Sequence, residues 1–245
     1  YRIGLTGTLD DSKTHKLVLQ GLFGTVNRVV STKQLIDKKQ LAQLKVMCLN
    51  LKYPEVEAKK VYGVKYFEEL EFLTQNTARN KYIRNLALAL KGNTLLLFQL
   101  VEKHGEILFN LIKEKADPKR KVFFVYGGTE TDDREKIRAI TEKSDNAIIV
   151  ASFGTFSTGI NIRNLHNIVF SSPTKSPIRV LQSIGRGLRV GDKKDSATVY
   201  DISDDLTYKD KKNFTLTHFM ERVGIYNSCL LYTSPSPRDK RQSRM

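Results

Sequence analysis

The run Thr94-Leu95-Leu96-Leu97-Phe98 begins a regular alternation of short apolar segments and amphipathic segments. Further strands are predicted at Lys121–Val125, Ala147–Ala151, Asn167–Phe170 and Ala197–Asp201, with helices between them at Val101–Lys115, Asp132–Glu142 and Pro177–Ile184. Continuous apolar strands that alternate with helices indicate an α/β fold with a mainly parallel sheet flanked by helices. Ligands of such sheets lie beyond the carboxyl ends of the strands, so residues that follow strands are the first candidates for a site.

The chain before Thr94 has a less regular pattern. A strand is predicted at Leu44–Leu51, and two helices within Val61–Leu90 are separated near Gln75-Asn76-Thr77. Shorter elements are expected at Ile3–Thr6 (strand), Lys13–Phe23 (helix) and Thr32–Lys39 (helix).

The composition indicates a polyanionic partner. The 245 residues are 40% hydrophobic, which suits a globular core, but the formal net charge is +15. No apolar run is long enough to cross a bilayer, so nucleic acid is favoured over a membrane. Two cysteines are too few for a disulfide framework and no signal peptide is present, which fits a cytoplasmic setting.

Two loops follow predicted strands and are rich in glycine and hydroxyl side chains. One contains Gly127-Gly128-Thr129, and the other runs from Ser152-Phe153-Gly154-Thr155 to Gly159-Ile160-Asn161. Small residues let backbone amides approach an anion closely. Taken alone, such a segment is better explained as an ordinary turn-rich loop, since Gly, Ser, Thr and Asn are common loop residues.

The segment Gln182-Ser183-Ile184-Gly185-Arg186-Gly187-Leu188-Arg189 carries two arginines one helical turn apart. Two guanidinium groups on one face suit the phosphates of a nucleotide. A solvated basic turn is the alternative.

The order of these segments resembles motifs V and VI of superfamily two helicases. Leu5-Thr6-Gly7-Thr8-Leu9 resembles motif III, and Thr94–Phe98 with Gln99 resembles motif IV. Residues 151–160 and 181–186 are similar to the UvsW-type DNA helicases of T-even-like phages. The resemblance extends over most of residues 1 to 226.

The resemblance implies that the chain is a C-terminal RecA-like domain that meets ATP in a cleft shared with a first RecA-like domain. Arg186 and Arg189 would then be arginine fingers. Gln182 would orient these arginines or contact the γ-phosphate. The nucleotide side of the cleft would be formed by Gly159, Asn161 and Gly185.

The same resemblance implies DNA as the partner, duplex or branched, bound mainly through its backbone. Thr6 and Thr8 would couple the ATP state to domain closure. The residues expected to contact nucleic acid are Gly128, Thr129, Gly154, Thr155 and Phe98.

The sequence departs from the family in one decisive respect, and in a smaller one at Ser183, where many relatives carry arginine. It contains neither a Gly-x-x-x-x-Gly-Lys-Ser/Thr loop nor an Asp-Glu-x-His or Asp-Glu-Ala-Asp box. We therefore expect a parent protein that is an ATP-dependent DNA helicase with roles in DNA recombination or repair. Its missing first domain would bind most of the ATP and Mg²⁺, so this chain alone would be inactive.

The predicted organisation has four parts. Residues 1–10 are a remnant of the first domain, 11–60 are the connection with a first strand, and 61–228 are the helicase C-terminal domain. Residues 229–245 are predicted to be read-through of a sequencing adapter, because their codons fit a transposase mosaic end.

Two alternatives remain open from the sequence, a helicase subunit of a restriction or remodelling enzyme and a non-catalytic nucleic-acid-binding module with a RecA fold. Several polar residues are given plain structural interpretations. His104 is predicted to be a surface or cap residue, the Glu68/Glu69 pair a solvated face or cap, and the Asp204/Asp205 pair a turn.

Overall fold

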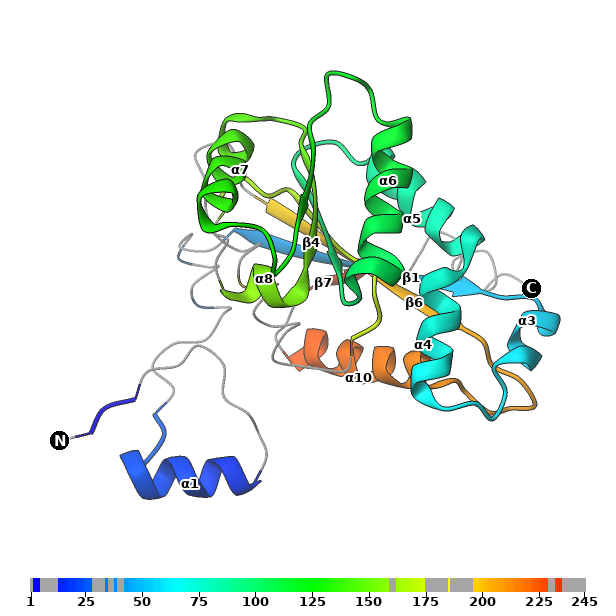
Figure 1. The fold of residues 1–245 in the computed structure, drawn as a ribbon. Coiled ribbons are helices and arrows are strands. Elements are labelled where there is room, and N and C mark those ends of the chain that lie inside the picture. The colour runs from blue at the N-terminus through cyan, green and yellow to red at the C-terminus, as the bar shows by residue number, and fades with distance from the viewer. Residues whose placement is uncertain are drawn as a thin grey trace.

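The computed structural model describes residues 2–4, 13–27, 34, 38, 42–158, 162–174, 185, 196–228 and 232–234 of the chain. Its described strands form one seven-stranded sheet of order β3-β4-β2-β5-β6-β1-β7, in which every pairing is parallel (Figure 1). The strands are β1 (Gln43–Lys52), β2 (Thr94–Phe98), β3 (Val122–Val125), β4 (Ile148–Ser152), β5 (Asn167–Phe170), β6 (Ser196–Asp205) and β7 (Tyr232–Ser234). The predicted α/β fold with a parallel sheet is confirmed.

Helices connect these strands. They are α1 (Lys13–Phe23), α3 (Glu55–Lys60), α4 (Tyr66–Gln75), α5 (Thr77–Ala89), the π-helical turn η1 (Val101–Gly105), α6 (Glu106–Lys115), α7 (Thr131–Lys143), α8 (Phe153–Thr158) and α10 (Phe214–Ser228). The predicted break between α4 and α5 is confirmed. It falls at Asn76, whose side chain accepts a hydrogen bond from the Arg79 amide and so caps the start of α5.

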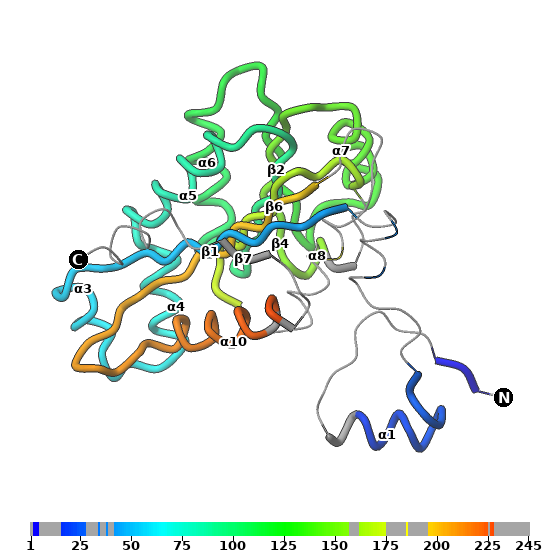
Figure 2. The backbone as a smooth tube through the Cα atoms, turned by 180° about the vertical axis from the view of Figure 1, so that it is seen from behind, coloured from blue at the N-terminus to red at the C-terminus, as the bar shows by residue number. Residues whose placement is uncertain are grey.

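The sheet is buried on both faces because its central strands are apolar throughout. In β2, Leu95 and Leu97 point into one layer, and Leu96 and Phe98 point into the other. Helices α5 and α6 cover the second layer, while α7, α8 and α10 contribute to the first (Figures 1 and 2). This arrangement explains why the strands read as continuous apolar runs.

Strand β1 belongs to the same sheet as the strands after residue 61. All ten of its residues pair with β6, from Gln43 opposite Ser196 to Lys52 opposite Asp205. The packed domain therefore includes β1, which the predicted division assigned to the connection. On its other edge, β1 pairs with β7, three residues of the segment predicted to be adapter read-through.

Other expectations fall partly or wholly outside the described residues. Residues 2–4 have no regular secondary structure, so the described part of the predicted strand Ile3–Thr6 is not a strand. The predicted helix Lys13–Phe23 is confirmed as α1. The predicted helix Pro177–Ile184 and nearly all of Thr32–Lys39 lie outside the described residues.

A buried carboxylate joins α4 to the start of α10. Glu69 is almost fully buried and accepts hydrogen bonds from the Phe214 amide (2.9 Å) and the Thr215 amide (2.8 Å). It also accepts from the Thr215 hydroxyl and the Asn213 side chain. A carboxylate at a helix N-terminus satisfies amides that have no partner within the helix. The predicted cap role is met by both residues of the pair. Glu69 caps α10 from another helix, and Glu68 accepts a hydrogen bond from the Lys65 amide at the start of its own helix, α4 (2.7 Å).

The plain interpretation of Asp204 is wrong. Asp204 lies fully buried in β6, where one carboxylate oxygen accepts from Arg79 Nε and from the Tyr53 hydroxyl, both at 2.8 Å. A buried carboxylate requires such partners because desolvation of an unpaired charge is costly. The partner Arg79 lies in α5, far away in sequence.

His104 is also buried rather than exposed. Its Nδ1 lies 2.7 Å from Ser172 Oγ, and burial, together with the positive charge of Arg79, lowers the pKa of His104 well below its usual value. In the native protein this imidazole is therefore neutral at pH 6, whereas in the unfolded chain it binds a proton near pH 6.5.

This difference predicts an acid-sensitive fold. As the pH falls below about 6.5, His104 binds a proton in the unfolded chain but not in the folded protein. The free energy of unfolding therefore falls by up to about 1.4 kcal/mol per pH unit. Urea unfolding at pH 7.5 and 5.5 measures the loss. In His104→Gln the loss should be smaller, and an identical pH dependence in both proteins would contradict the assignment to His104.

Candidate functional site

Several loops meet at the carboxyl edge of the sheet. Val125 at the end of β3 pairs with Ala151 of β4, and Phe98 at the end of β2 pairs with Ser152 of β4. Leu97 pairs with Phe170 at the end of β5. The segments that follow β3, β4, β2 and β5 are therefore neighbours in that order, as expected for the ligand edge of an α/β sheet.

The loop after β3 is a closed turn with an exposed ring. The Thr129 amide donates to the Tyr126 carbonyl, and the Tyr126 amide donates to the Thr129 hydroxyl, both at 3.0 Å. A Cβ added at Gly128 would lie 2.7 Å from the Tyr126 ring, so any larger residue would push this ring aside. From α7, Arg134 Nη2 donates to the Gly127 carbonyl and holds the turn. Gly127 and Gly128 stay exposed.

The loop after β4 turns directly into α8. Ser152 Oγ accepts from the Thr155 amide (3.2 Å) and lies 2.8 Å from the Thr155 hydroxyl, which is the geometry of an N-cap. Thr155 is only 5% exposed, whereas Gly154 is exposed, and a Cβ added at Gly154 would meet no atom within 4 Å. The backbone at Gly154 is thus the part of this loop that faces outward, and Thr155 holds the turn.

Phe98 was predicted to contact nucleic acid, which requires an exposed ring, but its ring is buried. Its side chain is fully buried, stacks on Phe124 at 5.5 Å between ring centroids and closes on Gly105 of η1. A ring enclosed on both sides cannot contact DNA, so the predicted nucleic-acid contact of Phe98 is replaced by a core role. The apolar run that ends at Phe98 indicated a buried strand. The sequence alone does not show whether the last residue of such a strand is buried or exposed.

The segment after β5 is anchored by a buried ion pair. Arg222 of α10 donates to both carboxylate oxygens of Asp201 (Nε–Oδ2 and Nη2–Oδ1, 2.8 Å each) and to the Thr174 carbonyl through Nη1 (2.8 Å). The Tyr226 hydroxyl donates to the same carboxylate at 2.6 Å. Burial alone would lower the pKa of Arg222, but the Asp201 carboxylate raises it, so this charge persists.

The anchored Thr174 lies before the double-arginine segment, residues 182–189, in the chain. Thr174 is the last described residue before residues 175–184, and Gly185 beyond them is helical and exposed. The other predicted nucleotide and coupling residues lie outside the described residues: Thr6, Thr8, Gly159, Asn161, Gln182, Arg186 and Arg189. Their roles stay predictions, and the part of the chain that leads to Gln182, Arg186 and Arg189 starts from the anchored Thr174.

The described residues contain no group of three or more His, Cys, Asp or Glu side chains arranged to hold a metal ion. In the same part of the chain, no helix has the length and apolar character that a bilayer span requires. The loops at the carboxyl edge offer instead glycine backbone and hydroxyl groups, which suit phosphate oxygens.

Sequence reasoning missed three residues of this edge. Tyr126 (37% exposed) and Arg134 flank the Gly127-Gly128-Thr129 turn, and Arg222 anchors Thr174. Tyr126 could have been noticed because it directly precedes the glycines. Arg134 and Arg222 contact backbone carbonyls across loops, and no spacing in the sequence indicates such contacts.

The fold and the edge define the class of protein. Residues 78–191 match the family model described as the helicase conserved C-terminal domain. The chain thus carries the C-terminal RecA-like domain of a superfamily two helicase.

Among its relatives is the ATP-dependent DNA helicase UvsW of enterobacteria phage T4, 36% identical over 239 residues, which are 92% of this chain and 47% of UvsW. The putative ATP-dependent helicase IRC3 of Saccharomyces cerevisiae is 24% identical over 69% of this chain and 24% of its own length. The chain therefore spans about half of UvsW and a quarter of IRC3.

Solved structures agree on the fold. The crystal structure of T4 UvsW superposes with a TM-score of 0.67 and 31% identity, over 88% of this chain and 44% of UvsW. The type ISP restriction-modification enzyme LlaBIII bound to DNA gives 0.58 at 16% identity, over 86% of this chain and 15% of that chain. S. cerevisiae Dbp5 L327V bound to RNA and ADP BeF3 gives 0.53 at 13% identity, over 97% and 52%. The last two support the fold alone.

Proposed function

We propose that this chain is the second motor domain of an ATP-dependent DNA helicase of the UvsW type. In this role it binds the DNA backbone at the carboxyl edge and supplies arginine fingers to ATP held mainly by a first motor domain. The observation that supports the proposal most strongly is that the predicted DNA-binding turns and the start of the segment that leads to the arginines lie at the same edge of the sheet. Register places the turns at Gly128 and Gly154 side by side, and the segment that leads to Arg186 and Arg189 leaves the same edge at Thr174.

The proposed chemistry divides between two domains. With Mg²⁺, the first domain would neutralise the phosphates of ATP and fix the leaving group. This chain's part is electrostatic, because Arg186 and Arg189 would meet the charge that develops on the transferred phosphoryl group. Gln182 would orient these guanidinium groups, and Gly159, Asn161 and Gly185 would border the nucleotide. The described residues suit this chain's part in the division, since the carboxyl edge exposes Gly128 and Gly154, where backbone can approach phosphate oxygens.

The DNA contacts are proposed to be mainly backbone groups. Gly127, Gly128 and Gly154 are exposed at adjacent strand ends, so their peptide groups can approach phosphates without side-chain interference. Thr129 and Thr155 would shape these turns through their hydrogen bonds. Such contacts carry little sequence preference and weaken with salt.

Gly154→Asp tests this edge. The position has open space for a side chain, so the carboxylate should fit and repel a phosphate there. We expect DNA affinity to fall at least about tenfold at low salt, measured by fluorescence anisotropy with a labelled oligonucleotide.

Gly154→Ala is the matched control, because it adds the Cβ without the charge and should bind DNA nearly as the unchanged chain does. Equal DNA affinity of the Asp and Ala variants, with both folded by circular dichroism, would remove Gly154 from the proposed DNA surface. No binding of DNA by the unchanged chain would count against the DNA-binding proposal as a whole.

A further inference from the structure

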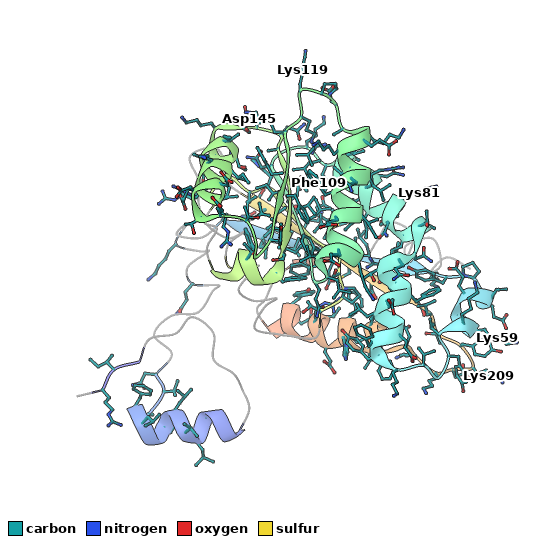
Figure 3. All side chains as sticks on the ribbon, in the orientation of Figure 1. Lys59, Lys81, Phe109, Lys119, Asp145 and Lys209 are labelled. Carbon is teal, nitrogen blue, oxygen red and sulfur yellow. The ribbon has the colours of Figure 1, made fainter. Side chains whose placement is uncertain are left out.

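A second surface of aromatic and basic residues lies beyond the end of β6. It consists of Tyr62, Tyr208, Lys209 and Lys211, with Lys59 of α3 beside them, and is called here the tyrosine–lysine patch. The Tyr62 and Tyr208 rings meet edge to face, with centroids 5.2 Å apart at 75°. Figure 3 shows Lys59 and Lys209 at the same end of the molecule, away from Lys119.

Lys209 and Lys211 of the patch lie in a tight turn. Tyr208 and Lys211 exchange backbone hydrogen bonds of 3.2 and 3.0 Å, and the two residues between them have positive φ, 45° at Lys209 and 60° at Asp210. Positive φ at both central positions defines a type I′ turn, which usually takes glycine or asparagine. A lysine here costs backbone strain, so its presence suggests a use for its side chain.

A small core fixes the patch in place. Val61, next to Tyr62, and Leu206, near Tyr208, are buried together with Ala58 and Leu73. The rings above this core are partly open to solvent, and Tyr62 is 46% exposed. Exposed aromatic rings on a rigid base can stack with planar groups at little entropic cost.

Two of the three lysines of the patch lie over its rings. Lys211 Nζ is 5.6 Å from the Tyr62 centroid, and Lys209 Nζ is 5.7 Å from the Tyr208 centroid. Within the described part of the chain, the three lysines of the patch form no ion pair with a carboxylate. Rings interleaved with unpaired cations are the combination that binds unstacked bases together with their phosphates.

The patch lies at the same end of the sheet, the carboxyl end, as the candidate site. Phe170, the last residue of β5, pairs with Asp201, and β6 continues to Asp205. At about 3.3 Å per residue, β6 carries the patch roughly 13 Å past the ends of the central strands. A strand of nucleic acid that crosses the turns at Gly128 and Gly154 can therefore continue toward the patch.

We propose that the tyrosine–lysine patch is a second binding surface for single-stranded nucleic acid, in which Tyr62 stacks on a base and Lys209 and Lys211 contact phosphates. The inference rests on the proposed DNA-binding function and extends it to a place that carries none of the helicase motifs. Single strands are favoured over duplex because bases must be unstacked to reach a ring.

The test compares two charge reversals in the full chain. Lys209→Glu with Lys211→Glu alters the patch, and Lys119→Glu with Lys121→Glu makes the same change of charge at the opposite, amino edge of the sheet. Binding of a labelled oligothymidine is followed by anisotropy over a range of salt concentrations. The patch variant should bind at least about tenfold more weakly than the amino-edge variant. Its slope against log salt should be smaller by about 0.7 for each phosphate that the variant no longer binds.

Variants of Tyr62 measure the contribution of ring stacking to affinity separately from that of the lysine charges. Tyr62→Phe keeps the ring and should retain affinity, whereas Tyr62→Ala should lower it about fivefold or more. Photo-cross-linking of a bromodeoxyuridine oligonucleotide, with the attachment site mapped by mass spectrometry, provides a readout that does not depend on stability. We expect attachment at Tyr62 or Tyr208.

The outcomes distinguish the two proposals. If the unchanged chain binds no oligonucleotide, the DNA-binding function and the patch both fall. If it binds, but the patch and amino-edge variants have equal affinity and equal salt slopes, the patch alone is overturned. If the patch variant loses duplex binding as strongly as single-strand binding, the preference for single strands is wrong and the inference is overturned in that form.

Discussion

Replacing Arg186 by alanine is expected to lower ATP turnover by about a thousandfold or more in a protein that contains both motor domains. A suitable protein is a chimera in which this chain replaces the matched half of phage T4 UvsW. The reason is electrostatic, because an arginine finger meets charge that exists only in the transition state. kcat should therefore fall much more than the affinity for ATP.

The comparison with Arg186→Lys sharpens this prediction. Lysine keeps the positive charge but loses the planar fork of donors, so its turnover should fall between that of the unchanged chimera and that of the alanine variant. Steady-state ATP turnover gives kcat, and binding of a fluorescent nucleotide gives affinity. An alanine variant with undiminished kcat would exclude Arg186 as a finger.

Replacing Arg222 by methionine is expected to destabilise the fold by about 3–5 kcal/mol. The change leaves the Asp201 carboxylate buried, without the two hydrogen bonds that Arg222 donates, and it removes the hydrogen bond from Arg222 Nη1 to the Thr174 carbonyl. Urea unfolding of the chain, followed by circular dichroism, measures the loss.

Two further variants test the cause. Lys136→Met removes one partner of an exposed pair with Asp133 and should leave the unfolding midpoint nearly unchanged. Arg222→Met combined with Asp201→Leu removes both buried charges, so it should recover a large part of the stability. A double variant as unstable as Arg222→Met alone would indicate that poorer packing, and not the orphaned carboxylate, dominates.

The same anchor connects stability to the proposed chemistry. Arg222 holds the carbonyl of Thr174, from which the chain leads to the double-arginine segment. A milder change, Tyr226→Phe, removes one hydrogen bond to Asp201 and keeps the ring. It therefore offers a way to loosen the anchor without unfolding the domain.

The sequence predicted the elements whose signal is local. The apolar runs Thr94–Phe98 and Asn167–Phe170 are strands with the predicted bounds, because strands buried on both faces must be apolar throughout. The break at Asn76 was found for a similar reason, since a helix N-cap is read within a few residues.

The sequence failed where distant residues meet. Asp204 was interpreted as a turn residue, yet it lies in β6 against Arg79, and only the tertiary fold brings these charges together. His104 was predicted to be a surface or cap residue, but in η1 it is buried beside Ser172. Phe98 was expected to contact DNA, but the apolar character that predicted its strand also buried its ring. A single sequence does not show which distant residues contact each other in the fold.

The candidate site was predicted in outline. The turns at Gly128 and Gly154 were expected at strand ends, and register places them together. The different exposure of Gly154 and Thr155 was not predicted. Gly154 is exposed and Thr155 is buried because of the hydrogen bonds between Ser152 and Thr155. The roles of Gln182, Arg186 and Arg189 remain predictions from the sequence.

Complementation is the decisive experiment for the proposal that this chain is one half of a two-domain ATPase. ATP turnover, with and without DNA, is measured for the purified chain and for the chimera with the remaining half of T4 UvsW. We expect no turnover by the chain alone and DNA-stimulated turnover by the chimera. ATP hydrolysis by the chain alone, or a folded chimera that binds ATP but never hydrolyses it, would contradict the two-domain proposal.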